Sequence, residues 1–374
     1  MEYEGDTYSF CSGACRDAMT ESDRVFTEYR GYRRFYPGVA ALDRSLPQGM
    51  LRNSFVLFSG QAGTRDAAVH AELVWRALQR GEPAVVLSFQ EPPVSVVERF
   101  LTLDWNVLPY LERDQLHVVD AFTYRLDDPD RMRERMNDWN QHLQRVVDGA
   151  STAVRDASDV RELANKVDAC LDAHGMVDTG VVLIDSLTEL GSLVQPVQAY
   201  NFVKDLRADV CKGRFVPIFA GATFGGKADA FPHDLDYTVD GVVDMQLNDD
   251  LVEDTLIKRV RIRKMNGVLT IPEWTAYEYT AGQGMVPFDP EVQMEKKRVE
   301  RVDEGEEAPA DDAEVSDAEA AGAADDADDA ESAEADGTTA SAAEGEDSGD
   351  EDRGSVDDPP PGGEESGTAA DDGG

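Results

Sequence analysis

Short apolar runs alternate with amphipathic segments through the central part of the chain, where apolar residues recur at helical spacing. Runs that are apolar at almost every position predict strands covered on both faces, as in a parallel sheet: Ser54–Ser59, Ala84–Phe89, Leu116–Asp120, Val181–Asp185 and Val216–Gly221. Period-two alternation predicts an antiparallel edge after them, in Val242–Leu247, Thr255–Lys264 and Val268–Ile271. The Arg- and Asp-rich segment before Val181 predicts two helices that break near Gly149. We therefore expect an α/β fold with a mostly parallel central sheet flanked by helices.

Composition divides the chain into three zones. Residues 1–29 are polar and carry two closely spaced cysteines, whereas residues 30–290 hold nearly all the aromatic and β-branched side chains. Residues 291–374 consist mainly of Asp, Glu, Ala, Gly and Ser. A segment of that composition cannot bury enough apolar surface to offset its ordering entropy. We therefore predict a separate cysteine segment, one globular domain and a disordered acidic tail.

The excess of acidic residues limits the cellular environments and the binding partners that suit the chain. The chain has 35 basic and 76 acidic residues and a formal net charge of −41, which makes nucleic-acid or anionic-membrane binding unfavourable. Because concentrated salt screens such repulsion, the composition predicts a halophilic cytoplasm; the alternative is an ordinary acidic protein with a disordered tail. The sequence shows neither a run of about 18 apolar residues nor a signal-peptide pattern, and its four cysteines form no disulfide framework. These patterns predict a cytoplasmic protein without membrane insertion.

The stretch from Ser54 to Gly81 has the order of a phosphate-binding loop: an apolar strand, a glycine-bearing turn and a helix. The motif G-x-x-x-x-G-K-[ST] cradles phosphates with backbone N–H groups, neutralises them with Lys and holds Mg²⁺ with the hydroxyl. The chain keeps part of this motif and changes the rest: Gly60, Gly63 and Thr64 are compatible, whereas Arg65, Asp66 and Ala67 replace Gly, Lys and Ser/Thr. A simpler interpretation is that Arg65 and Asp66 only begin the helix from Ala67 to Gln79.

The apolar run VVLIDSLTEL, Val181–Leu190, ends a predicted strand in a carboxylate. Asp185 would lie at the edge where open α/β sheets bind ligands, and such an Asp organises Mg²⁺ in P-loop enzymes. The same letters also form a helix start, with Ser186 as N-cap and Glu189 three residues later. The two interpretations are compatible with each other.

With this strand the chain resembles the KaiC-like proteins of the RecA superfamily, of the haloarchaeal transducer-like type. The resemblance covers roughly residues 31–288 and rests on four segments in the expected order: Tyr36–Gly60, Val85–Phe100, Val181–Leu190 and Lys264–Gly267. It implies a RecA/KaiC-like P-loop fold and ATP with Mg²⁺ as cofactor. By the same resemblance, Gln90 and Glu91 stand at the family's catalytic glutamates, and Lys264 belongs to the family's Lys-x-Arg-Gly strand.

The departures from the family pattern fall at four positions of the site. Asp66 would repel a phosphate by roughly 4 kcal/mol at about 4 Å and an effective dielectric of 20. Ala67 lacks the Mg²⁺-binding hydroxyl, Gln90 cannot accept a proton, and Asn266 replaces the Arg that would reach a neighbouring subunit. We therefore expect a non-catalytic regulatory or scaffold protein, a pseudo-ATPase that binds other proteins or itself. The alternative is an ATP-binding, weakly active ATPase in signalling or DNA repair.

The N-terminal cysteines, Cys11 and Cys15, suggest a second chemistry. Their surroundings resemble the latter half of a YHS/TRASH-type metal-binding module, matching its core at Tyr8, Phe10, Cys11, Ser12 and Cys15. The i, i+4 spacing would place both sulfurs on one helical face, suited to Zn²⁺ or Cu(I). Two ligands cannot complete a tetrahedral zinc site, so zinc is expected only if the N-terminus is longer. A metal sensor is the second alternative function.

The remaining candidates are weak. The five histidines are scattered and show neither an H-x-x-x-H pattern nor a Ser/His/Asp arrangement: His70, His117, His142, His174 and His233. The loop Gly225–Thr238 stands where RecA-like proteins carry mobile loops, but it is acidic overall. Nucleic-acid binding there is therefore not expected.

Overall fold

The structure is a computed structural model, which describes residues 2–3, 6–7, 9–28, 33–224, 233–249, 255–290 and 292. The acidic tail predicted for residues 291–374 lies outside the described residues apart from Val292, and so does most of the acidic loop at 225–238. The N-terminal segment, taken by itself, contains a strand pair, Glu2–Tyr3 (β1) with Asp6–Thr7 (β2), and the helix Gly13–Glu28 (α1).

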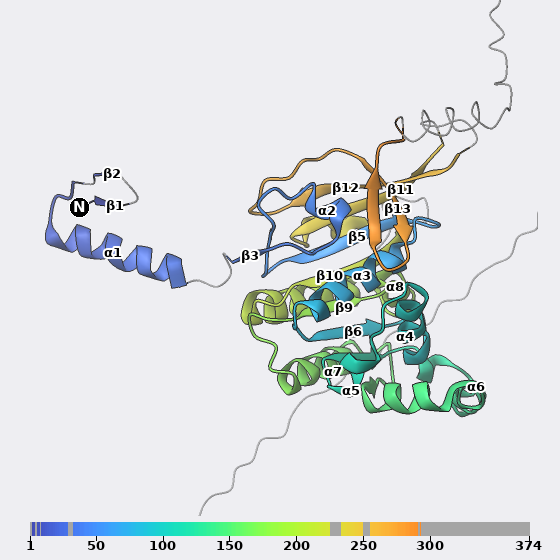
Figure 1. The fold of residues 1–374 in the computed structure, drawn as a ribbon. Coiled ribbons are helices and arrows are strands. Elements are labelled where there is room, and N and C mark those ends of the chain that lie inside the picture. The colour runs from blue at the N-terminus through green and yellow to red at the C-terminus, as the bar shows by residue number, and fades with distance from the viewer. Residues whose placement is uncertain are drawn as a thin grey trace, which may run out of the picture. The chain divides into compact units, whose positions relative to one another are not determined.

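A single sheet with the strand order β14-β13-β12-β11-β5-β10-β9-β6-β7-β8 forms the centre of the globular body (Figure 1). From β11 to β8 every neighbouring pair is parallel, whereas β12, β13 and β14 continue the sheet antiparallel. The parallel strands are β5 (Phe55–Gln61), β6 (Ala84–Ser88), β7 (Leu116–Asp120), β8 (Ser151–Ala153), β9 (Val181–Ile184), β10 (Ile218–Phe224) and β11 (Gly241–Asn248). The antiparallel strands are β12 (Ile257–Met265), β13 (Thr275–Thr280) and β14 (Gly284–Phe288).

Helices cover both faces of the parallel strands, which explains why those strands are apolar at successive positions. Val56 and Phe58 of β5 belong to a core with helices α3 to α6, whereas Phe55 and Leu57 belong to a second core with α7 to α9. The helices are α3 (Asp66–Gln79), α4 (Pro93–Thr102), α5 (Leu108–Glu112), α6 (Pro129–Gly149), α7 (Val160–Ala173), α8 (Leu187–Leu193) and α9 (Pro196–Leu206). No helix in the described part of the chain is long and apolar enough to cross a membrane.

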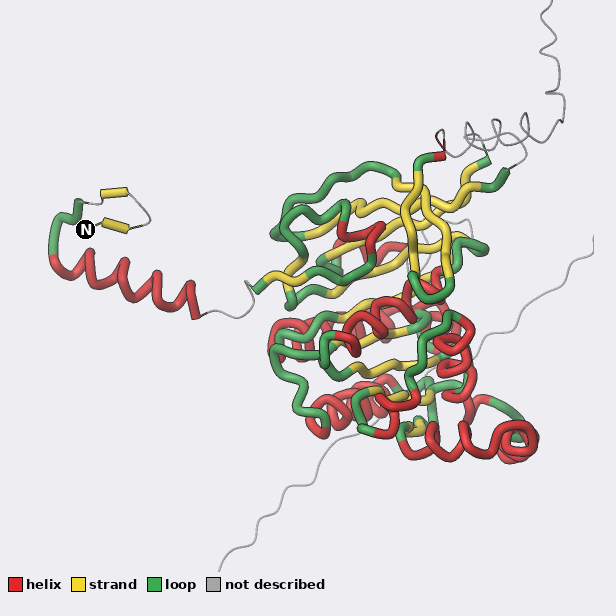
Figure 2. Tube along the Cα trace, in the orientation of Figure 1, coloured by secondary structure: helices red, strands yellow, loops and turns green. Residues whose placement is uncertain are grey.

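Short elements complete the body. They are β3 (Arg34–Phe35), which pairs with β4 (Met50–Leu51), the helix α2 (Ala40–Asp43), the 3₁₀ turns Thr123–Arg125 and His233–Tyr237, and a π-helical turn at Arg207–Gly213. Figure 2 shows the long helices grouped around the parallel strands, with the antiparallel strands at the other end of the body.

The predicted α/β class with an antiparallel C-terminal edge is confirmed, and so are the two helices separated near Gly149. The strand predicted at Val268–Ile271 is wrong: this segment is a bend followed by irregular backbone, and its Leu269 and Ile271 are exposed. The edge is instead completed by the hairpin β13–β14, and the short strand β8 extends the other side. Alternating apolar residues occur in exposed loops as well as in paired strands, so this pattern alone could not distinguish the two.

Candidate functional site at the carboxyl edge of the sheet

The predicted phosphate loop lies between the end of β5 and the start of α3, as its sequence order indicates. The Gln61 carbonyl accepts hydrogen bonds from the Thr64 amide at 3.1 Å and from the Thr64 hydroxyl at 2.7 Å. The Thr64 carbonyl accepts a third from the Tyr277 hydroxyl at 2.7 Å, and Thr64 is fully buried. Thr64 therefore braces the turn internally, and its hydroxyl is already engaged.

Arg65 keeps the backbone shape that the motif assigns to glycine. It adopts the left-handed conformation, with φ 59° and ψ 42°, directly before the first residue of α3. Gly63, two residues earlier, also has a positive φ of 95°. A non-glycine residue in this region costs roughly 1–2 kcal/mol. The loop therefore preserves the geometry of a phosphate cradle although one of its glycines is replaced.

Replacing Arg65 with Gly should stabilise the protein by up to about 1 kcal/mol, since relief of the left-handed strain exceeds the added backbone entropy of glycine. The midpoint of urea unfolding measures this change. The matched control is Arg161→Gly, an exposed residue in the first turn of α7, which should destabilise by about 0.5–1 kcal/mol. Equal destabilisation by both substitutions would contradict the strain at Arg65.

Asp66 stands in the motif's Lys position and is the first residue of α3. Its side chain turns back over the end of β5: a Cβ added at Gly60 would lie 3.2 Å from the Asp66 Cβ and 3.5 Å from its Cγ. A carboxylate at a helix N-terminus interacts favourably with the exposed N–H groups there. An anionic ligand would use the same N–H groups, so the Asp66 carboxylate would compete with it.

Asp185 follows β9 and is almost completely buried, with 5% of its surface exposed. Its carboxylate accepts hydrogen bonds from Phe89 N at 2.8 Å, from Gln90 N at 3.0 Å and from the Ser88 hydroxyl at 3.0 Å. Burial raises the pKa of Asp185, although these hydrogen bonds oppose the shift. The carboxylate is therefore tied to the end of β6 rather than to the loop after β5.

The Ser88 hydroxyl links Asp185 to the segment after β6. Its oxygen lies 2.8 Å from the Glu91 carbonyl and 3.0 Å from Oδ2 of Asp185, and the amides of Phe89 and Gln90 donate to the same carboxyl group. Asp185 is therefore held within a hydrogen-bonded network at the end of β6.

The segment after β6 holds the family's two glutamate positions. Gln90 is exposed and contributes its backbone amide to Asp185, whereas Glu91 forms an ion pair with Arg99 of α4 at 2.8 Å. Arg125 crosses the same edge, donating to the Phe89 carbonyl at 2.8 Å and pairing with Glu189 at 3.1 Å. The structure therefore brings Gln90, Glu91 and Asp185 together, with β10 between their strands and β5.

Ser186 and Lys264, which the sequence singled out, both form hydrogen bonds within their own part of the chain. Ser186 is the N-cap of α8, as predicted, and its hydroxyl accepts from the Glu189 amide at 3.1 Å. Lys264 pairs with Val242 near the amino end of β11 and donates to the carbonyls of Asp236 at 2.6 Å and Val239 at 2.8 Å. Lys264 therefore closes the connection before β11 and does not join the loop of its own chain.

His70 is a buried group that sequence reasoning missed. It packs edge-on against Phe58 with ring centroids 5.6 Å apart, and it fills the space beside Gly221, where a Cβ would lie 2.3 Å from His70 Cε1. Burial lowers the pKa of His70 to about 4, so the ring is neutral at pH 7, and its Nε2 has no hydrogen-bond partner among the described residues. Only the tertiary packing of α3 on β10 reveals this contact.

The N-terminal thiols lie close together, with Cys11 Sγ and Cys15 Sγ 3.2 Å apart. Only Cys15 is helical, because α1 begins at Gly13 and Ser12 caps it by accepting from the Cys15 amide at 3.2 Å. The expectation that both sulfurs lie on one helical face is therefore wrong, although their proximity is retained. Hydrogen bonds with Ser12 and then Cys11 lower the pKa of the Cys15 thiol. Within the described residues, no third His, Cys, Asp or Glu joins this pair.

The sheet order, the strand–loop–helix turn at residues 60–67 and the acidic end of β9 define a P-loop ATPase fold of the RecA superfamily. The sequence model of the family described as "ATPase: KaiC" matches residues 36–290. This match spans most of the chain, and the chain belongs to the KaiC ATPase family.

Curated relatives and solved structures agree with this assignment. A UPF0273 protein of Pyrococcus horikoshii is 24% identical over 235 residues, which cover 63% of this chain and 86% of the relative. A UPF0273 protein of Methanopyrus kandleri is 27% identical over 273 residues, covering 71% and 96%. The crystal structure of a KaiC-like protein from Pyrococcus horikoshii superimposes with a TM-score of 0.53 at 15% identity, covering 69% of this chain and 99% of that one. This structural likeness shows the fold.

Proposed function

We propose that this KaiC-family chain is a non-catalytic regulatory or scaffold protein, a pseudo-ATPase that acts by binding other proteins or further copies of itself. The observation that carries the proposal is Asp66, which stands at the motif's Lys position with its side chain beside Gly60. A carboxylate about 4 Å from a phosphate charge costs roughly 4 kcal/mol at an effective dielectric of 20. The lysine that would provide the opposite interaction is missing.

Other features of the site also oppose ATP hydrolysis. Ala67 offers no hydroxyl to Mg²⁺, Asp185 is buried in a hydrogen-bonded network, and Glu91 is paired with Arg99. Phosphoryl transfer depends almost wholly on positioning and on stabilisation of charge, so each of these features removes one contribution. The large negative charge of the chain supports a halophilic cytoplasmic setting and protein partners rather than nucleic acid.

One observation favours the alternative, an ATP-binding and weakly active ATPase in signalling or DNA repair. The loop keeps the positive φ angles at Gly63 and Arg65 that turn backbone N–H groups toward a phosphate. The metal-sensor alternative draws on the closeness of Cys11 and Cys15, which would need further ligands to close a zinc site.

Calorimetric titration of Mg-ATP into the full chain at molar KCl tests the proposal. We expect no saturation below millimolar nucleotide and no phosphate release above the rate in buffer. An Asp185→Ala variant is titrated in parallel, because Asp185 is the one acidic group of the family's Mg²⁺ site that the chain keeps. Submillimolar binding that disappears in Asp185→Ala would reject the pseudo-ATPase and favour the weakly active ATPase.

A further inference from the structure

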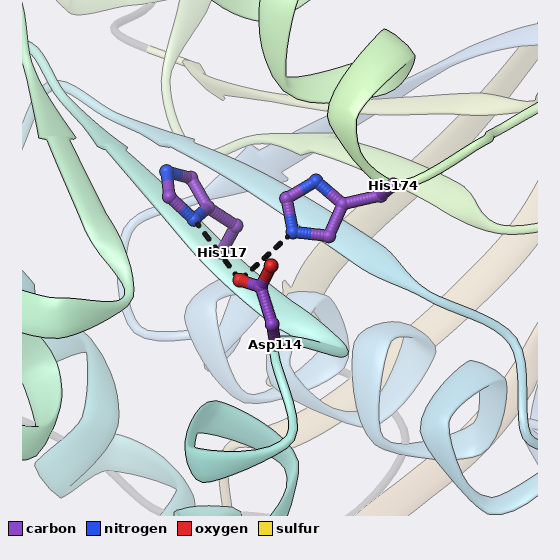
Figure 3. Close-up of side chains that lie close together, drawn as sticks. All are labelled: Asp114, His117 and His174. Carbon is purple, nitrogen blue, oxygen red and sulfur yellow. Dashed lines mark hydrogen bonds and ion pairs between the residues drawn. The ribbon is translucent and has the colours of Figure 1, made fainter.

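Three potential metal ligands converge at the amino edge of the parallel sheet, the edge opposite the phosphate loop. Asp114 lies in the loop that leads into β7, His117 lies on β7, and His174 directly follows α7. Figure 3 shows the Asp114 carboxylate between the two imidazole rings, which reach it from separate elements. Sequence spacing gave no sign of this cluster, because His117 and His174 are brought together only by the packing of α7 on β7.

The separations of the donor atoms suit a small cation. Asp114 Oδ1 lies 3.1 Å from His174 Nε2 and 3.8 Å from His117 Nδ1, and the three ligand atoms all lie within 4.8 Å of one another. In tetrahedral zinc sites, bonds of about 2.0–2.2 Å place neighbouring ligand atoms roughly 3.3–3.6 Å apart. Small side-chain rotations would therefore bring these atoms to coordination distances.

The far nitrogen of each ring is held by a second group, as in known metal sites. His174 Nδ1 lies 2.6 Å from the Cys170 carbonyl, which can only accept, so Nδ1 carries a proton and Nε2 is the nitrogen that faces Asp114. His117 Nε2 lies 2.8 Å from the Thr152 hydroxyl, and its Nδ1 is buried with no hydrogen-bond partner among the described residues. One nitrogen of each ring thus faces the Asp114 carboxylate, while the other nitrogen is engaged elsewhere.

We propose that Asp114, His117 and His174 bind a divalent transition metal of the zinc class. Two imidazoles with one carboxylate match the ligand preference of Zn²⁺, whereas Mg²⁺ and Ca²⁺ prefer oxygen ligands alone. The Asp114 side chain is 66% exposed, which leaves the fourth position to water. The bound metal would tie the loop before β7 to the end of α7. This site does not depend on the nucleotide loop.

The competing explanation is an ordinary ion pair between Asp114 and a protonated His174. That pair would need no metal, and it would leave His117 Nδ1 without a partner. The two explanations differ in stoichiometry: the ion pair predicts no specific binding of zinc at pH 7.5, whereas the proposed site predicts one equivalent that depends on all three residues.

The test is titration of Zn²⁺ and of Co²⁺ into the EDTA-treated full chain carrying Cys11→Ser and Cys15→Ser, at molar KCl and pH 7.5. The serine changes remove the two exposed thiols, and the salt suppresses loose binding to surface carboxylates. We expect one equivalent of either metal and the visible absorption of four-coordinate cobalt. Zinc at 100 times its dissociation constant should raise Tm by about 5–10 °C.

The decisive variants are Asp114→Asn and His174→Gln. Asp114 has a left-handed backbone, with a φ of 57°, as does Asp104 earlier in the chain, with a φ of 61°. Asn adopts this conformation readily, so Asp114→Asn should preserve the fold. Since changes outside the ligand shell already cost about 10–100-fold, loss of one ligand should weaken zinc binding by about 100-fold or more. The matched control His142→Ala removes an exposed histidine from α6 and should leave binding unchanged. Absence of a zinc equivalent in the starting protein, or equal binding in Asp114→Asn, would overturn the proposal.

Discussion

Replacing Arg65, Asp66 and Ala67 together with Gly, Lys and Thr should increase the affinity for Mg-ATP about a thousandfold. The triple substitution rebuilds the full motif, GQAGTGKT, on a loop whose backbone already has the required conformation at Gly63 and residue 65. Removing the repulsion of Asp66 alone contributes roughly 4 kcal/mol at an effective dielectric of 20, and 1.36 kcal/mol corresponds to a factor of ten. Because the effect is electrostatic, the gain should shrink as KCl increases.

Calorimetric titration of the triple variant, with Asp66→Asn and Ala67→Thr as separate controls, measures this gain. Asp66→Asn should recover most of it by removing the negative charge, whereas Ala67→Thr alone should change little while the repulsion persists. Hydrolysis should stay slow in every variant, because Gln90 and Asn266 are unchanged. If the triple variant still fails to bind, then the buried Asp185 network, rather than the charge at Asp66, blocks the site.

The fold was predictable because its information lies in local patterns. Strands covered on both faces must be apolar at successive positions, and β5, β6, β7 and β9 show this directly in the sequence. The turn after β5 could be placed by its glycines, and Ser186 could be recognised as an N-cap from its own neighbours. The antiparallel end was harder: Val268–Ile271 alternates like a strand but lies in an exposed loop, because strand pairing depends on residues distant in sequence.

The site was predictable as a set of positions but not as a set of contacts. The strand pattern placed Asp185 at the carboxyl edge of the sheet, the family resemblance singled out Gln90 and Glu91, and the structure brings the three together. Spacing could not show that Asp185 accepts its hydrogen bonds from the end of β6, or that Lys264 is held by carbonyls of its own chain. It also missed His117 and His174, whose approach depends on tertiary packing.

Asp240→Ala should destabilise the protein by about 3 kcal/mol, since Asp240 anchors the amino end of the strand that carries the phosphate loop. Its Oδ2 accepts from the Phe55 amide at 3.1 Å, and its carboxylate pairs with Arg207 at 2.7 Å and with Lys212 at 3.2 Å. Removing one partner of a buried ion pair costs about 3–5 kcal/mol. The lower value applies because the Arg207 and Lys212 side chains keep about a third of their exposure.

The pH dependence of this loss distinguishes the ion pairs from simple packing. Burial alone would raise the pKa of Asp240, but the hydrogen bonds from Arg207 and Phe55 and the charge of Lys212 outweigh it, so the pKa lies below its usual value. The stabilisation is therefore complete above the unfolded pKa of about 3.9 and is lost as the pH falls through the folded pKa. Urea unfolding at pH 7 and at pH 3 should show a smaller difference between wild type and Asp240→Ala at the lower pH.

Asp168→Ala is the control, because Asp168 pairs with Arg214 at 2.6 Å but is 55% exposed and should cost less than about 1 kcal/mol. A difference for Asp240→Ala that is the same at both pH values would assign the loss to packing rather than to charge.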